Sequence, residues 1–143
     1  MFENSVREFQ IIEEIGKGGF GAVFRAYDKN LNRDVAIKII LPEYANDEKF
    51  KKRFEIEAHL VAQLEHINIV PLYNYWQDES GAYLVMRYIR GGSLRKTINQ
   101  HGTLSLSHTI RLLEQIADAL DVAHHNDIIH RDIKPENILL DER

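Results

Sequence analysis

The sequence predicts an α+β fold, in which a five-stranded antiparallel sheet with one long inserted helix is followed by a helical region. Three observations lead to this prediction. Residues 9–40 contain apolar stretches rich in β-forming side chains, separated by a glycine-rich turn at 16–21. Residues 47–64 repeat apolar side chains at helical spacing. After residue 90, patterns typical of helices replace those typical of strands.

Five short stretches in the first part of the chain are predicted to be strands. Each is rich in β-branched or aromatic residues and is bounded by residues that favour turns. Pro42 ends the third strand because it cannot donate a ladder hydrogen bond. Asn46 or Asp47 could cap the inserted helix, since a short polar side chain can accept from the free N–H groups of a first turn. The predicted strands are 9–15, 22–27, 35–40, 69–76 and 82–88.

A glycine-containing break divides the chain into two predicted domains. Residues 90–93 read Arg-Gly-Gly-Ser and interrupt the strand pattern with residues that favour turns. We therefore predict a small lobe at 1–89 and the start of a larger, helical lobe at 90–143.

The second domain is predicted to be mainly helical. A short helix is expected near 93–100 and a long one at about 107–125, followed by a polar loop at 130–136 and an apolar strand at 138–140. One face of the long helix carries apolar side chains at helical spacing. These side chains are Ile110, Leu113, Ile116, Ala117, Leu120 and Ala123.

The composition excludes several classes of protein. The net charge of -4 argues against a nucleic-acid partner or a membrane-surface binder, which would present a basic face. The chain has no cysteine, which excludes disulfides, thiol nucleophiles and cysteine zinc sites and fits a reducing compartment. It shows neither a signal-peptide core nor an apolar run of about 20 residues. We expect a cytoplasmic protein, although a membrane anchor beyond Arg143 would also fit.

The glycine-rich turn has the pattern G-x-G-x-x-G followed by Ala-Val, over residues 16–23. Glycines let backbone N–H groups approach phosphate oxygens that side chains would block. The same spacing occurs in dinucleotide-binding units, where the glycines must open a helix. Here residues 22–27 favour a strand, which indicates a hairpin lying over a nucleotide. The alternative is a tight hairpin with only a structural role, which binds no nucleotide.

Two charged residues lie on otherwise apolar elements. The predicted strand at 35–40 is apolar except for Lys38. A buried carboxylate is costly unless it is paired, so we expect Lys38 to pair with Glu57 of the inserted helix. Alternatively Lys38 reaches solvent from an edge strand, and Glu57 lies at the edge of the apolar stripe with water or Arg53 as its partner. The stripe around Glu57 consists of Phe50, Phe54, Val61 and Leu64.

The strongest signal is the stretch His-Arg-Asp-Ile-Lys-Pro-Glu-Asn at 130–137. Phosphoryl transfer needs a carboxylate for the acceptor hydroxyl's proton, a cation beside the moving phosphoryl group and an oxygen ligand for Mg²⁺. Asp132, Lys134 and Asn137 supply these three groups. A solvated polar turn would explain any one of these three residues. It would not explain why all three follow, in this order, the glycine-rich turn and the charged residues Lys38 and Glu57.

Taken together, the motifs resemble those of Ser/Thr protein kinases, most of all the bacterial kinases similar to eukaryotic ones. The matching patterns are G-x-G-x-x-G-x-V at 16–23, V-A-I-K at 35–38 and H-R-D-x-K-P-E-N at 130–137. The resemblance runs from Phe9 to the last residue and implies a protein-kinase-like fold. It implies an enzyme that uses ATP and Mg²⁺ to phosphorylate Ser or Thr hydroxyls of protein substrates.

The resemblance also implies a role for each matching residue. Asp132 would be the catalytic base, Lys134 the contact to the γ-phosphate and Asn137 a Mg²⁺ ligand. Lys38 would bind the α- and β-phosphates and pair with Glu57. The nucleotide would contact Ile15, Gly16, Lys17, Gly18, Gly19, Phe20, Gly21, Ala22, Val23, Ala36, Lys38, Met86, Arg87, Ile89, Ser93 and Leu139.

Some of these contacts are more specific. The resemblance implies that Met86 is the gatekeeper beside the adenine. It implies that the adenine edge hydrogen-bonds to the Arg87 C=O and the Ile89 N–H, and that Ser93 reaches the ribose.

The chain departs from the family pattern at its end. The family places Asp-Phe-Gly, with the main Mg²⁺ carboxylate, and an activation segment after the strand at 138–140, whereas this sequence stops at Arg143. We therefore expect the 143 residues by themselves to show no turnover. We also expect the apolar stripe of the 107–125 helix to be exposed, so that the chain alone is marginally stable, self-associates or needs a partner.

Other functions stay open as alternatives. The first is a non-catalytic kinase-like lobe that binds nucleotide or a partner, which reading the gene beyond codon 143 would test. The second is a small-molecule phosphotransferase of similar fold, which the Lys-Pro-Glu-Asn stretch at 134–137 disfavours. The alternative that the chain is a dinucleotide-binding oxidoreductase requires residues 22–27 to be helical.

Overall fold

The computed structural model describes residues 5–130 and 132–141. They form two compact units, one consisting of the chain through Gln63 together with Val70–Tyr88, and the other of Leu64–Ile69 together with the chain from Ile89 onward. Residues 64–69 are predicted from the sequence to belong to the first lobe. Their place in the second unit has a visible cause, because Asn68 Nδ2 donates to the Gln115 C=O at 3.3 Å.

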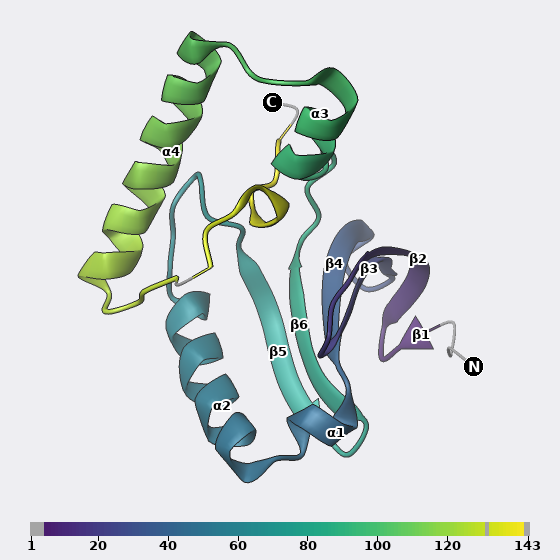
Figure 1. The fold of residues 1–143 in the computed structure, drawn as a ribbon. Helices are drawn as coiled ribbons and strands as arrows, with labels where there is room; N and C mark the ends of the chain where they lie inside the picture. The colour runs from purple at the N-terminus through teal and green to yellow at the C-terminus, as the bar shows by residue number, and fades with distance from the viewer. Residues whose placement is uncertain (1–4, 131, 142–143) are drawn as a thin grey trace. The chain divides into compact units, whose positions relative to one another are not determined.

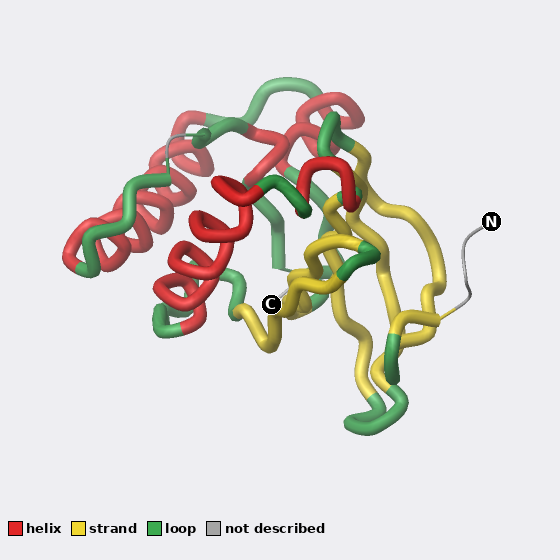
Figure 2. Tube along the Cα trace, turned by 90° about the horizontal axis from the view of Figure 1, so that it is seen from below, coloured by secondary structure: helices red, strands yellow, loops and turns green. Residues whose placement is uncertain are grey.

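The first unit is built on an antiparallel sheet with the strand order β1-β2-β3-β4-β6-β5 (Figure 1). Its strands are the yellow segments in Figure 2. It has six strands rather than the five expected, because Ser5 and Val6 pair with Gln10 and Phe9. The strands are β1 (Ser5–Val6), β2 (Phe9–Lys17), β3 (Gly21–Asp28), β4 (Arg33–Ile40), β5 (Leu72–Asp78) and β6 (Gly81–Arg87). Apart from β1, each corresponds to a predicted strand, with ends shifted by no more than three residues.

Two helices connect β4 to β5. Pro42 ends the strand and occupies the first turn of α1 (Pro42–Ala45), a short helix that the sequence analysis did not predict. The long helix α2 (Glu48–Ala62) begins after Asp47, whose side chain accepts a hydrogen bond from the Phe50 N–H at 3.3 Å. Asp47 is therefore the cap of this helix.

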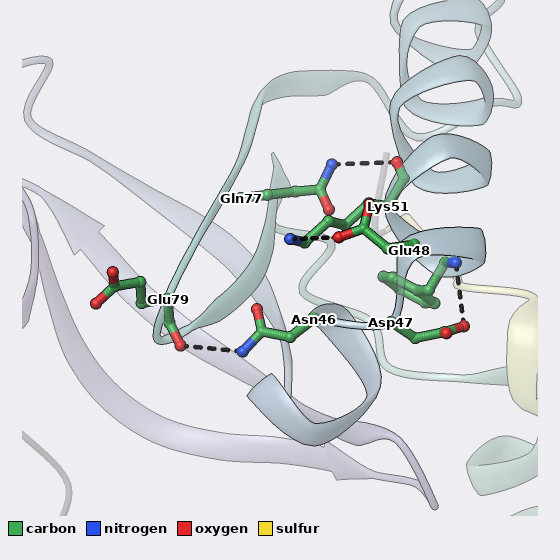
Figure 3. A network of polar contacts seen from close by, with 7 residues as sticks. Asn46, Asp47, Glu48, Lys51, Gln77 and Glu79 are labelled. Carbon is green, nitrogen blue, oxygen red and sulfur yellow. Dashed lines mark hydrogen bonds and ion pairs between the residues drawn. The ribbon is translucent and has the colours of Figure 1, made fainter.

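Polar contacts join the start of α2 to the hairpin between β5 and β6 (Figure 3). Gln77 Nε2 donates to the Lys51 C=O at 3.3 Å, and Asn46 Nδ2 donates to the Glu79 C=O at 3.5 Å. Lys51 also pairs with Glu48 one turn earlier, at 3.5 Å. These contacts fix where α2 begins relative to the sheet.

The apolar core lies on both faces of the sheet, because successive side chains of a strand point to opposite faces. On one face, Val35 and Ile37 of β4 are fully buried in a cluster that includes Trp76. On the other, Ile40 packs with Phe54 of α2, which runs alongside β5 in Figure 1. Ala36 and Lys38, two of the predicted nucleotide contacts, lie on this second face with Ile40, because they are two and four residues before it on β4.

The second unit contains α3 (Leu94–His101), α4 (Leu106–His125) and the 3₁₀ turn η1 (Pro135–Asn137). Ser93 caps α3 and Ser105 caps α4, each through its side-chain oxygen. The strand expected at 138–140 is not formed, since Leu139 makes only an isolated bridge with Ser93. Within the described part of the chain, no helix has the length and apolar character needed to cross a membrane.

Candidate active site

The glycine-rich turn joins two strands and opens no helix. Gly16 pairs with Val23 and Lys17 with Ala22 across the hairpin formed by β2 and β3. The Gly18 N–H closes the turn by donating to the Gly21 C=O at 2.9 Å. Because residues 22–27 are a strand, the dinucleotide-binding alternative is ruled out.

The glycines of this hairpin serve different purposes. A Cβ on Gly21 would lie 1.9 Å from the Ile39 carbonyl oxygen, so only glycine allows β3 to begin this close to β4. A Cβ on Gly18 or Gly19 would meet no atom within 4 Å. The backbone at Gly18 and Gly19 is therefore open on one side, as a loop that wraps phosphate oxygens requires.

The tip of the hairpin rests against α1. The Leu41 N–H donates to the Phe20 C=O at 2.9 Å. The Phe20 ring packs edge-on against the Tyr44 ring, with 5.0 Å between centroids. The hairpin thus has a defined position within the first unit.

Four of the predicted nucleotide contacts share one face of the sheet. Val23 of β3 lies directly opposite Lys38 of β4, and Ala36, two residues before Lys38, lies opposite Met86 of β6. Side chains opposite each other, or two residues apart on one strand, point to the same face. Ala36 is buried, Val23 and Met86 are half-buried, and Lys38 is exposed. The ammonium group is therefore accessible on an otherwise apolar face.

The expected ion pair between Lys38 and Glu57 is absent from the contacts of the described residues, and both side chains are exposed. The side chains of α2 that pack on the sheet are Phe50, Phe54 and Ala58, spaced four residues apart. Because a helix turns about 100° per residue, Glu57 points to one side of this stripe. The expectation that Glu57 faces the core is wrong, and the alternative position at the stripe's edge is observed.

The predicted catalytic residues converge in the loop after α4. Asp132 Oδ2 lies 3.5 Å from Lys134 Nζ and 3.2 Å from Asn137 Nδ2. Asn137 Nδ2 also donates to the Asp132 C=O at 2.9 Å, and the Asp132 N–H donates to His130 Nδ1 at 3.1 Å. The Asp132 side chain is 63% exposed, so this carboxylate is both positioned and accessible. Arg131 lies outside the described residues.

The segment after this loop is held by the segment before α3. The Leu94 N–H donates to the Ile138 C=O at 2.7 Å, and the Leu140 N–H donates to the Gly92 C=O at 2.8 Å. A Cβ on Gly91 would lie 2.0 Å from the Leu140 carbonyl oxygen. Glycine at this position is what allows the two segments to approach so closely.

A side-chain pair joins the same two segments. Arg95 Nε donates to Glu136 Oε1 at 2.7 Å. This charge-assisted hydrogen bond, together with the guanidinium charge, lowers the pKa of the Glu136 carboxyl. The sequence predicts no role for Arg95, because no local pattern signals a contact between residues so far apart along the chain.

The predicted site residues are divided between the two units. The first unit holds the residues from Ile15 through Met86 and Arg87, and the second holds Ile89 and those after it. Ser93, expected near a ribose, uses its hydroxyl to accept from the Lys96 N–H as the cap of α3. The predicted residues in the second unit are Ile89, Ser93, Asp132, Lys134, Asn137 and Leu139.

One oxygen of the loop suits a hard cation. Asn137 uses its amide nitrogen for both contacts with Asp132, which leaves Oδ1 without a hydrogen bond among the described residues. No group of three His, Cys, Asp or Glu side chains among the described residues could hold a metal ion. A Mg²⁺ ion here would need further oxygen ligands, which nucleotide phosphates commonly supply.

A glycine hairpin on an antiparallel sheet, an exposed strand lysine and a converging Asp–Lys–Asn loop are the features of a protein kinase. Comparison with known families agrees, since the protein kinase domain model matches residues 9–143. The chain belongs to the protein kinase domain family.

The similar proteins include bacterial and animal kinases. The chain is 44% identical to serine/threonine-protein kinase PrkC of Bacillus subtilis over 133 residues, which is 93% of this chain and 20% of PrkC. It is 39% identical to PknD of Mycobacterium tuberculosis, covering 92% of this chain and 20% of PknD. It is 36% identical to Aurora kinase C of Mus musculus, covering 95% of this chain and 49% of the kinase. The chain thus spans about a fifth of the length of these bacterial relatives.

A solved structure shows the same fold. The crystal structure of Rad53 residues 1–466 in complex with AMP-PNP superposes with a TM-score of 0.84 at 30% sequence identity. The match covers 94% of this chain and 35% of the Rad53 chain.

Proposed function

We propose that this chain is the nucleotide-binding and catalytic-loop part of a Ser/Thr protein kinase, which transfers the γ-phosphoryl group of ATP to Ser or Thr hydroxyls of proteins. The observation that carries the proposal is the convergence of Asp132, Lys134 and Asn137 in one exposed loop. The names of the similar proteins, serine/threonine-protein kinases among them, support the same reaction.

ATP would be bound on the sheet face that carries Lys38. The open backbone at Gly18 and Gly19 would donate hydrogen bonds to phosphate oxygens, and the accessible ammonium of Lys38 would add a positive charge beside them. The apolar side chains of Val23 and Ala36 on the same face suit an adenine ring. The AMP-PNP bound to Rad53, a protein of the same fold, supports this choice of ligand.

In the reaction, Asp132 would orient the acceptor hydroxyl and take its proton as the oxygen attacks the γ-phosphorus. The bond from the γ-phosphorus to the β–γ bridging oxygen would break, and ADP would leave. Lys134, which already lies beside this carboxylate, would balance charge on the phosphoryl group. Asn137 Oδ1 would bind Mg²⁺, which would neutralise the charge of the phosphates. The role of Glu57 as the partner of Lys38 stays a prediction, because the two side chains are not in contact in this structure.

Phosphoryl transfer tests the proposal. The protein made from the whole reading frame that contains these codons is incubated with labelled ATP, Mg²⁺ and casein. We expect phosphoserine and phosphothreonine in the product, with the rate about 10²- to 10⁴-fold lower in Asp132→Asn, because the amide cannot take the proton.

A matched control separates the catalytic effect from a general effect of the same substitution. Asp127→Asn changes another exposed aspartate, and its positive φ of 62° is a conformation that asparagine tolerates. We expect this variant to keep wild-type transfer. Full activity in Asp132→Asn would overturn the proposal. So would transfer of label to an aminoglycoside in a parallel reaction without any transfer to casein.

We further propose that this chain self-associates through α4. Three apolar side chains spaced at helical intervals are exposed on this helix, namely Leu106, Ile110 and Leu113. At the other end of the predicted stripe, Ala123 is buried, so the exposed patch is smaller than expected. The cytoplasmic location expected from the sequence stays a prediction.

A further inference from the structure

The ion pair between Arg95 and Glu136 connects two parts of the second unit that lie 41 positions apart in the sequence. Arg95 belongs to the first turn of α3, and Glu136 belongs to the 3₁₀ turn η1 of the catalytic loop. Their side chains are each 46% exposed. Exposed ion pairs contribute little to folding stability, so we expect this pair to have a role other than stabilising the fold.

The pair continues the backbone contacts between the same two segments. Leu94, next to Arg95, donates its N–H to the C=O of Ile138, which lies two residues after Glu136. The backbone bond and the side-chain bond therefore hold the turn at two successive points. Two points of attachment restrict the rotation of a short turn more than one does.

The orientation of the η1 backbone determines where the Asn137 side chain points. Glu136 and Asn137 are neighbours in η1, so a rotation that moves one side chain moves the other. In the observed orientation, Asn137 reaches both the backbone carbonyl and the carboxylate of Asp132. Lys134 of the same loop forms its ion pair with Asp132, whereas Glu136 forms its ion pair with Arg95.

We propose that Arg95 is a positioning residue of the catalytic loop, which holds Glu136 so that the amide of Asn137 faces Asp132. The catalytic meaning of this inference rests on the proposed kinase function. The coupling itself is a property of the fold and is measurable without activity.

Nuclear magnetic resonance on the 143-residue chain tests the coupling. The readouts are the cross-relaxation between the Asn137 side-chain amide protons and Asp132, and the hydrogen exchange of the Leu94 and Leu140 amides. We expect Arg95→Gln and Glu136→Gln each to abolish the Asn137–Asp132 signal and to speed exchange at Leu94 and Leu140 about tenfold. Exchange within α4 should stay unchanged.

Two further variants make the result specific. The charge-reversed pair Arg95→Glu with Glu136→Arg recreates the ion pair in the opposite sense and should restore both readouts. Asp121→Asn removes the carboxylate of a different exposed pair, with His125 at 3.5 Å, and should change neither.

The outcomes distinguish this inference from the proposed function. If the single variants keep the Asn137–Asp132 signal, or if exchange speeds up equally throughout α4, Arg95 is not a positioning residue. If the coupling is found but the protein made from the whole reading frame transfers no phosphoryl group, the inference about the loop stands and the kinase proposal fails.

Discussion

Single residues of the glycine hairpin have separate physical roles. Gly21 is required by packing, since a Cβ there would lie 1.9 Å from a backbone oxygen that cannot move aside freely. Gly18 has open space where its side chain would be. One sequence motif therefore combines a glycine needed for the fold with a glycine available for a ligand.

This difference predicts opposite effects of the same substitution. Gly21→Ala should destabilise the protein by about 1–3 kcal/mol, because β3 and β4 must move apart to admit the methyl group. Gly18→Ala should leave the unfolding free energy unchanged or raise it slightly, because alanine restricts the unfolded chain. Urea unfolding followed by circular dichroism measures both. Equal losses in the two variants would contradict this account.

For single residues, the sequence predicted which residues form the catalytic loop better than it predicted contacts between residues far apart in the chain. Asp132, Lys134 and Asn137 were predicted together and are found together, because they lie within six residues of one loop. Glu57 was expected to face the core, but the helix packs through Phe54 and Ala58 instead. A stripe of apolar residues defines the buried side of a helix only to within about one residue, which is enough to misplace a charge.

Among the elements, α2, α3 and α4 lie close to where the sequence predicts helices, whereas the short helix α1 is not predicted. Asp47, Ser93 and Ser105 each cap a helix through a hydrogen bond to an N–H three residues later. Such a signal needs no knowledge of distant residues.

The cap of α2 gives a prediction at the scale of the element. Asp47→Ala should lower stability by about 1 kcal/mol, since the Phe50 N–H loses its acceptor. Asp47→Asn should retain most of the stability, because asparagine caps helices about as well as aspartate. Thermal and urea unfolding provide the measurement, and an asparagine variant as unstable as the alanine variant would show that the cap bond is not the cause.

Elements that depend on partners were predicted poorly. The strand β1 has only two residues and exists because β2 offers a free edge. The stretch at 138–140 is apolar enough to read as a strand, yet it pairs only through Leu139 with the chain before α3. Pairing partners far apart in sequence decide such cases, and no local pattern reports them.

For the whole molecule, the exposed apolar side chains of α4 predict association in solution. Sedimentation velocity should show a weight-average mass that rises with concentration. Leu113→Lys should reduce this rise because it places a charge in the patch. Gln115→Lys, which adds the same charge to an exposed position on another side of the helix, should not. Monomeric behaviour of the unsubstituted chain at all concentrations would refute the proposal.

The family was predictable from the whole sequence because three motifs occur in order, while no single motif would have sufficed. The glycine turn alone fits several folds, and the structure excludes one of them by forming β3 directly after it. The lysine of β4 and the loop at 130–137 belong to different units. Only their combination points to phosphoryl transfer.

Nucleotide binding by this chain tests the central claim most directly. Calorimetric titration with AMP-PNP and Mg²⁺ should give saturable binding at one site, weakened about 10- to 100-fold in Lys38→Met, because a charge-assisted contact to phosphate is lost. Lys49→Met, which removes an exposed lysine of α2, should bind as the unsubstituted chain does. The account is contradicted if the chain binds no nucleotide, or if the Lys38 variant binds it equally well.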